Sequence, residues 1–270
     1  MPQMSSSTFH ALSAAAYESF MGRWSRRLCE PFIRFAGIAD GETIIDVGCG
    51  TGSLTIAIAG AANINGVVGI DLSEAYLEHA KRNAKDARIA FSKGDATALD
   101  FPDAKFDRAM SMLVLQFVPD ADRAILEMKR VVRSDGIVAA GVWDSYGGMP
   151  AQRMFWDTAA NLGLAREGDL KGFFFRPMTQ PGEMAAAWTR HGLMDVRHSS
   201  MTIRMEYASF ADYWAPIASG EAALGKFATS LAQAERESLE KGVRMSYLGG
   251  MPDGPRSFAA TTWVCKGRVP

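Results

Sequence analysis

Three alternating glycines form the stretch of this sequence whose spacing is best suited to chemistry. Gly48, Gly50 and Gly52 lie in the run DVGCGTG, and Asp46 stands just before them. A residue without a Cβ adopts a positive φ at low cost and lets a ligand lie against the main chain. The run therefore predicts a tight turn on which a flat or bulky ligand rests.

A further acidic residue follows these glycines at an informative distance. Asp71 ends the run GVVGID, roughly 20 residues downstream, where an acid after the second strand accepts hydrogen bonds from ribose hydroxyls. A dinucleotide fingerprint of the form GxGxxG needs a glycine at position 53, and the chain has Ser53 there. A nicotinamide-dependent oxidoreductase is therefore the less favoured interpretation.

Taken together, DVGCGTG and GIDLS resemble the class I S-adenosylmethionine (SAM) dependent methyltransferases, most strongly over residues 40–144. The resemblance implies SAM as the cofactor. It places Leu72 and Tyr76 beside the adenine, and Asp95 and the Ala96 backbone against the polar edge of that ring. The implied cofactor-binding set is Arg23, Trp24, Asp46, Gly48, Cys49, Gly50, Gly52, Asp71, Leu72, Tyr76, Gly94, Asp95, Ala96, Met112, Leu113 and Gln116.

Two members of this set have an ordinary structural alternative. Tyr76 is equally suited to packing on the sheet, and an aspartate in a loop such as Asp95 is often a turn or cap residue. The end of the fourth expected strand, Ser111 to Gln116, should face the reactive methyl group, because ligands of open α/β sheets lie at the carboxyl ends of strands. Its sequence lacks the Asn/Asp-Pro-Pro-aromatic run of enzymes that methylate nucleobases.

The elements that must position these residues read as a βα repeat. Strands are expected at 42–47, 67–71, 88–92, 106–115 and 137–143, with helices between them, which favours a parallel sheet with right-handed crossovers. Later strands are expected at 194–207 and 257–268. The resemblance implies an α/β, doubly wound, seven-stranded Rossmann-like sheet of order 3-2-1-4-5-7-6 with the last strand antiparallel.

The resemblance also suggests a division of the chain. Residues 1–35 are expected to form an N-terminal helical lid with a break near Gly22, in which Tyr17, Arg23 and Trp24 close over SAM and arginine pairs with its carboxylate. The alternative is an amphipathic helix that only packs on the sheet. Residues 36–270 form the methyltransferase domain, with helical cap insertions at about 145–190 and 208–250.

The aromatic residues of the expected cap indicate what kind of molecule accepts the methyl group. Aromatic side chains crowd its ends, and bulky apolar groups around a cleft favour a small, largely apolar or aromatic molecule. Anchoring of the insertion on the sheet is the alternative role for the same side chains. The expected acceptor-binding residues are Tyr17, Trp143, Phe210, Trp214 and Tyr247.

No residue is assigned to catalysis. Transfer from a sulfonium leaves a neutral thioether, so holding the acceptor in line is the main task, and a base is needed only for a poor nucleophile. None of the four histidines has a partner in the sequence that would define it. A domain that binds SAM or its product without chemistry, as a sensor or scaffold, therefore stays open.

Composition narrows the remaining classes of function. The formal net charge of −1 gives no positive field for nucleic acid or an anionic membrane. No carboxylate or histidine cluster shows metal-ligand spacing, and the three separated cysteines are typical of a reducing compartment. No apolar run is long enough to span a bilayer, and the first residues lack the features of a signal peptide. We therefore expect a cytoplasmic protein with no metal, and the oligomeric state stays open.

Overall fold

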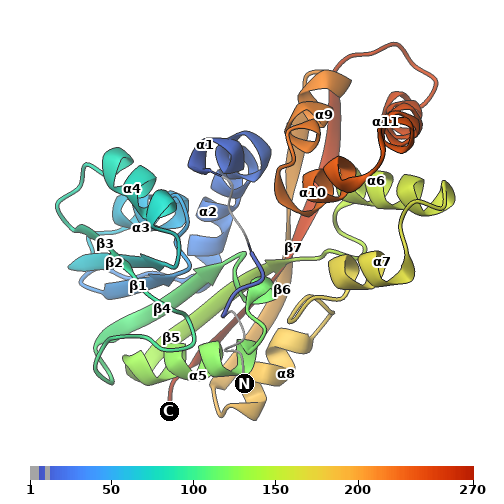
Figure 1. Ribbon diagram of the computed structural model, residues 1–270. Coiled ribbons are helices and arrows are strands. Elements are labelled where there is room, and N and C mark those ends of the chain that lie inside the picture. Colours follow the sequence, from blue (N-terminus) through green and yellow to red (C-terminus); the bar gives the residue numbers. More distant parts are fainter. Residues whose placement is uncertain (1–5, 10–12) are drawn as a thin grey trace.

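The βα repeat builds the frame of the computed structural model, which describes residues 6–9 and 13–270 (Figure 1). Seven strands form one sheet of order β3-β2-β1-β4-β5-β7-β6, with β7 antiparallel to both neighbours, which confirms the expected topology. The strands are β1 (Thr43–Val47), β2 (Gly66–Asp71), β3 (Ile89–Lys93), β4 (Phe106–Met112), β5 (Val132–Trp143), β6 (Met194–Tyr207) and β7 (Arg256–Arg268).

Helices cover both faces of the sheet, and each hides an apolar side against it. On one face lie α2 (Arg23–Ala36), α3 (Ser53–Ala61) and α4 (Glu74–Asn83), and on the other lie α5 (Ala121–Val131) and α8 (Glu183–Arg190) (Figure 1). Ser73 and Asp120 cap α4 and α5 by accepting from the backbone N–H three residues on. Two buried clusters, one on each face, form the core.

The connection before β5 differs from the expected turn. Residues 133–136 form a bulge within β5, so that Val132 pairs with Phe106 and Ile137 with Arg108. Asp135 has a φ of 62° there. A Cβ on Gly136 would lie 2.5 Å from the carbonyl oxygen of Asp107, and so the neighbouring strand requires glycine at this position.

The cap is smaller than expected in one part. Helix α8 packs on β6 and β7 and belongs to the sheet, so the first insertion contributes only α6 (Pro150–Asn161) and α7 (Glu167–Phe174). The second insertion adds α9 (Phe210–Ala218), α10 (Ala222–Ser230) and α11 (Gln233–Leu248). Figure 1 shows these helices gathered beside the long β6–β7 pair, away from α3 and α4.

The N-terminal segment is helical from Ala14, with α1 (Ala14–Tyr17) followed by a π-helical turn (Glu18–Gly22) that runs into α2. The helix is therefore continuous through Gly22, and a π-helical turn lies where a break was expected. A Cβ on Gly22 would lie 2.6 Å from the Glu18 carboxyl, so the missing side chain makes room for that acid. No helix in the described part of the chain has the length and apolar character needed to cross a bilayer.

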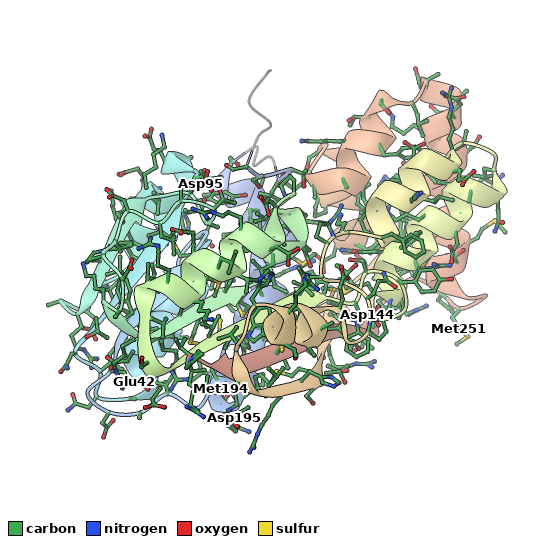
Figure 2. The ribbon with its side chains drawn as sticks, turned by 90° about the horizontal axis from the view of Figure 1, so that it is seen from below. Glu42, Asp95, Asp144, Met194, Asp195 and Met251 are labelled. Carbon is green, nitrogen blue, oxygen red and sulfur yellow. The ribbon has the colours of Figure 1, made fainter. Side chains whose placement is uncertain are left out.

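The amino and carboxyl ends of the parallel strands lie at opposite edges of the sheet, and the candidate site residues gather at one of them. In Figure 2, Glu42 and Met194, which stand at the starts of β1 and β6, lie at one edge, and Asp95, which follows β3, lies at the opposite edge. The glycine turn after β1 and the ends of β2 and β4 share the edge of Asp95, because these strands are parallel. The candidate site is therefore at the carboxyl edge.

Candidate functional site

A cavity of about 810 Å³ opens at the carboxyl edge of the sheet, between the sheet and the cap. The sequence-predicted residues that line it come from several separate segments. They are Asp46, Gly48, Cys49, Gly50, Asp71, Leu72, Tyr76, Gly94, Asp95, Ala96, Met112, Leu113 and Gln116, together with Tyr17 and Trp143 from the expected acceptor set.

The three glycines of the turn have different roles. Each has a positive φ. A Cβ on Gly48 would lie 2.4 Å from Val114 Cγ2, and one on Gly52 would lie 3.0 Å from the Cβ of Ala80, whereas one on Gly50 would meet no atom within 4 Å. Gly48 and Gly52 thus allow the turn to pack, and Gly52 lies outside the cavity wall. Gly50 presents bare main chain to the cavity.

Asp71 fastens the turn as well as facing the cavity. Its Oδ2 accepts from the Gly50 N–H at 2.9 Å, and its Oδ1 accepts from the Ser73 N–H at 2.8 Å. Burial raises the pKa of Asp71, and these backbone hydrogen bonds act in the opposite direction. Each carboxylate oxygen keeps a second lone pair, so the group can still accept from a ligand hydroxyl.

Asp46 lies deeper, at the end of β1. Its carboxyl is buried and accepts from the Thr55 hydroxyl at 2.6 Å. Burial raises the pKa of Asp46 to about 7, against the lowering effect of that hydrogen bond. Such a carboxyl faces a strong penalty for ionisation, and a cationic ligand in the cavity would relieve it.

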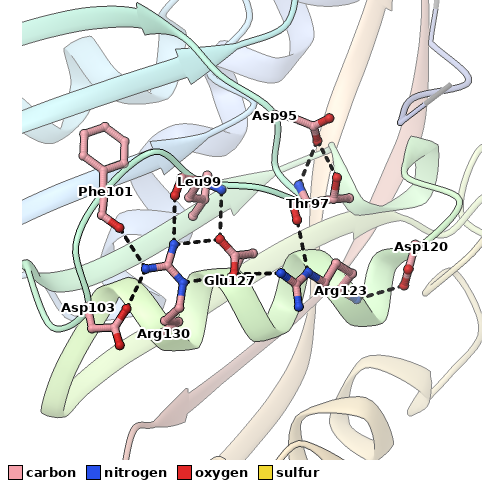
Figure 3. Close-up of polar contacts among 9 residues, drawn as sticks. All are labelled: Asp95, Thr97, Leu99, Phe101, Asp103, Asp120, Arg123, Glu127 and Arg130. Atoms are coloured by element: carbon pink, nitrogen blue, oxygen red, sulfur yellow. Dashed lines mark hydrogen bonds and ion pairs between the residues drawn. The ribbon is translucent and has the colours of Figure 1, made fainter. Parts of the chain in front are cut away.

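Asp95 is held by its own loop and by α5 (Figure 3). Its Oδ1 accepts from both the backbone N–H and the hydroxyl of Thr97, and the Thr97 carbonyl accepts from Arg123 Nε at 3.2 Å. Burial opposes ionisation of Asp95, but the hydrogen bonds from Thr97 and Ser6 outweigh it and lower its pKa. The side chain is thus a turn residue, as the alternative proposed, and it also borders the cavity.

The end of β4 forms the floor of the cavity. Leu113 has a φ of 66° and donates its N–H to the Gly141 carbonyl at 2.7 Å. Gln116 is held by the Trp143 N–H, which donates to its Oε1 at 2.8 Å. A left-handed backbone at a leucine is uncommon and concentrates at functional sites. Leu113, Gln116 and Trp143 all line the cavity.

Residues 6–9 pass over the cavity and make a polar contact with the far side. The Thr8 N–H donates to the Phe117 carbonyl at 2.8 Å. The ring of Phe9 lies 5.0 Å from that of Phe117 and 6.3 Å from those of Tyr17 and Tyr76. We call Ser6–Phe9 the strap. Together with Tyr17 and Tyr76, whose rings lie 5.3 Å apart, it covers one side of the cavity with aromatic surface.

Arg23 and Trp24 differ from expectation, because neither lines the cavity. Arg23 pairs with Asp212 of α9 at 2.9 Å and stacks on the rings of Trp24 and Tyr207. Trp24 is buried against Tyr207. Arg23 thus joins α2 to the cap, and Trp24 packs α2 on β6. The carboxylate that pairs with Arg23 is that of Asp212 and not the expected carboxylate of SAM.

Phe210, Trp214 and Tyr247 also lie outside the cavity wall. All three are buried. Phe210 stacks on Trp214 with ring centroids 5.8 Å apart, and its edge meets Tyr247 at 5.6 Å. These side chains belong to the core of the cap, which also includes Phe155 and Trp156 of α6. The structure therefore places them as anchors, the alternative role.

Other residues line the cavity that sequence reasoning did not single out. Glu18 accepts from the Thr51 hydroxyl at 2.6 Å and pairs with Arg26, so it ties the N-terminal segment to the glycine turn. Of these, Thr51 reaches the cavity wall. The cap contributes Phe173, Phe175, Arg176, Glu221 and Lys226. Only the run Phe173-Phe174-Phe175 offered a signal in the sequence, as an apolar patch suited either to the core or to a pocket wall.

Comparison with known proteins agrees with this geometry. The family described as "Methyltransferase domain" matches residues 45–140. A demethylmenaquinone methyltransferase of Staphylococcus aureus (strain JH9) is 38% identical over 117 residues, 43% of this chain and 47% of that protein. A 27-O-demethylrifamycin SV methyltransferase of Amycolatopsis mediterranei is 34% identical over 119 residues, 43% of each chain.

The likeness extends to solved structures at the level of the fold. Phosphoethanolamine N-methyltransferase 2 of Haemonchus contortus, solved in complex with SAM, superposes with a TM-score of 0.59 at 17% identity, over 95% of this chain and 57% of that one. The chain spans less than half the length of the curated relatives it matches. Over residues 45–140 it carries the methyltransferase domain of the class I SAM-dependent methyltransferases, and its seven-stranded sheet has their strand order.

Proposed function

We propose that this protein transfers a methyl group from SAM to a small-molecule acceptor. The observation that carries the proposal is the convergence of the predicted cofactor residues from the ends of β1, β2, β3 and β4 on one cavity, whose remaining wall belongs to the cap. Two curated relatives are named for methylating demethylmenaquinone and 27-O-demethylrifamycin SV, which supports an acceptor of small-molecule size.

The residues present fit the cofactor. Bare main chain at Gly50 leaves open space for a ligand, and the oriented Asp71 carboxyl beside it can accept from ribose hydroxyls. SAM supplies a methyl group on a positively charged sulfur. The buried carboxyl of Asp46 and the half-buried carboxyl of Asp71 can provide negative charge that suits a cation of this kind.

The contribution of the protein to the reaction is orientation. Leu113 and Gln116 form a rigid floor where β4 ends, and the strap and Tyr17 exclude water from the side. Holding two reactants in line contributes about 7–11 kcal/mol in well-oriented systems. No side chain is required to form a covalent bond with the acceptor, so the proposal does not depend on a nucleophilic residue.

Two measurements test the proposal. Calorimetry with SAM, S-adenosylhomocysteine (SAH) and NAD should show binding of the first two and not of NAD. Incubation with methyl-labelled SAM and a metabolite extract should then yield a labelled small molecule. Binding of SAH without any labelled product would favour a non-catalytic sensor or scaffold, and binding of NAD alone would favour an oxidoreductase.

A further inference from the structure

Arg176 stands in the wall of the cavity just after α7. Its side chain is half-buried, and its guanidinium lies 4.9 Å from the ring centroid of Phe117 and 4.8 Å from that of Phe173. Phe117 follows the end of β4 and Phe173 belongs to the cap. The cation is therefore held between the cofactor half and the cap half of the cavity.

This guanidinium has no acidic partner among residues 6–9 and 13–270. No ion pair joins it to a carboxylate in that part of the chain, and its one hydrogen bond there goes to the Gly172 carbonyl at a long 3.4 Å. Arg153 offers a contrast within the cap. It also stacks on a phenylalanine, Phe174, but it pairs with Asp157 at 2.8 Å and does not line the cavity.

An arginine in this setting lacks most of its hydrogen-bond acceptors. Guanidinium carries five N–H donors in a planar fork that matches a carboxylate or phosphate in two parallel bonds. Contact with two aromatic rings restricts the guanidinium and displaces part of its hydration. Burial lowers the pKa of Arg176 to about 10, the direction expected for a cation without a counter-charge.

Most acidic groups near the cavity already accept hydrogen bonds or pair with another residue, and Asp46 accepts from the Thr55 hydroxyl. Asp71 and Asp95 accept from backbone N–H groups of their own loops, and Asp122, near the outer side of Arg176, pairs with Arg190. Glu221 of the cap has a buried oxygen without a partner in the described chain, and burial raises its pKa. In the cap part of the wall, the charge of Glu221 would instead favour a cationic acceptor, so an anionic and a cationic acceptor can be tested against each other.

We propose that Arg176 binds an oxyanion of the methyl acceptor, so that the acceptor is a small molecule with a carboxylate or phosphate on an apolar or aromatic body. The aromatic rings of Phe117, Phe173 and Phe175 supply the apolar surface for that body. This inference rests on the proposed function, since it treats the wall beyond the β4 end as the acceptor site.

The experiment uses small probes on the full chain saturated with SAH. Benzoate, phenyl phosphate and the neutral benzyl alcohol are titrated into wild type, Arg176→Gln and the matched control Arg153→Gln, and binding is followed by ligand-detected NMR. We expect at least one anion to bind wild type and the control, with a tenfold or greater loss in Arg176→Gln. Benzyl alcohol should be insensitive to either substitution, and the preferred anion distinguishes carboxylate from phosphate.

Benzylamine and the variant Glu221→Gln are titrated in the same way, as the test of a cationic acceptor. Three results would overturn the inference. They are equal anion binding in Arg176→Gln and wild type, no anion binding to wild type, or a preference of wild type for benzylamine that is lost only in Glu221→Gln. SAH affinity is measured first in every variant. Absence of SAH binding to wild type would defeat the proposed function itself, whereas normal SAH binding with any of the three results defeats only the assignment of Arg176.

Discussion

At the scale of single residues, the buried Asp46 lowers the stability of the folded chain when it ionises, and the same charge should help to bind SAM. Its folded-state pKa of about 7 lies above the ordinary value near 3.8, so the folded chain holds the proton more tightly than the unfolded chain. The contribution of this group to stability is therefore most favourable below about pH 4 and declines as the pH rises to about 7. Above that pH it stays constant.

Replacing Asp46 by Asn should separate the two effects. The amide stays neutral and can still accept from Thr55, so Asp46→Asn should gain about 2 kcal/mol in the free energy of unfolding, relative to wild type, between pH 5 and pH 8. SAM affinity at pH 8 should fall at least about tenfold, because a negative charge leaves the site of a cation. Denaturant titrations at the two pH values and calorimetry decide this. A variant whose stability relative to wild type is independent of pH would show that Asp46 titrates normally.

Substitutions of Gly50 and Gly48 should separate an effect on SAM binding from an effect on stability. Gly50→Ala should leave the fold intact and lower the free energy of unfolding by about 1–2 kcal/mol, because alanine is strained at a φ of 54°. The new methyl group would face the cavity, so SAM binding should weaken at least about tenfold. Gly48→Ala should instead destabilise the fold more strongly, because its Cβ would press on Val114 at 2.4 Å. Thermal unfolding and calorimetry on both variants test the pair. If Gly50→Ala binds SAM like wild type, the ligand does not lie on this turn.

Some of this residue-level chemistry could be read from the sequence, and some could not. The spacing of Gly48, Gly50 and Asp71 reports on local backbone, so it predicted which residues meet at the cavity. It could not show that Asp71 also holds the Gly50 N–H. Replacement of Asp71 by Ala should therefore loosen the turn as well as remove the ribose acceptor, and a loss of SAM binding in that variant alone would not isolate the ribose contact.

At the scale of elements, the strap reaches the cavity together with Tyr17 and the helical turn that follows it. Phe9→Ala removes ring contacts to Phe117, Tyr17 and Tyr76 and should raise the SAM dissociation constant by roughly three- to tenfold, as one aromatic pair contributes about 0.5–1.5 kcal/mol. Arg23→Ala is the control, since it should lower stability and leave SAM affinity unchanged. Equal SAM affinity in Phe9→Ala and wild type would limit the strap to packing.

The sequence predicts an element well where a local apolar pattern defines it. It does not predict where that element lies when long-range packing determines its position. The βα repeat through β5 followed from alternating apolar strands and capped helices, such as α4 behind Ser73. Helix α8 has the same local pattern as the cap helices, and its packing on β6 and β7, with Trp188 donating to the Val138 carbonyl of β5, places it on the sheet. The N-terminal arginine and tryptophan likewise looked suited to a ligand, although the partner of Arg23 is Asp212, far along the chain.

At the scale of the whole molecule, two insertions far apart in sequence share one apolar core. Trp214 of α9 lies 6.2 Å from Phe155 of α6, and α11 packs against α6. Residue type could not distinguish this core from a pocket wall, because aromatic side chains serve both. Burial decides it, since Trp214 is 6% exposed and faces other side chains of the cap.

Trp214→Ala should therefore act on stability and not on the cofactor. A cavity in the cap core is expected to reduce the free energy of unfolding by about 3–5 kcal/mol. SAM stabilises the folded chain by RT ln(1 + [L]/Kd), about 2.7 kcal/mol at 100 times Kd, and this increment should be the same in Trp214→Ala and wild type. Denaturant titrations with and without SAM measure both quantities in one experiment. A smaller increment in the variant would mean that the cap core and the cofactor site are coupled, because a perturbation confined to the cap leaves Kd unchanged.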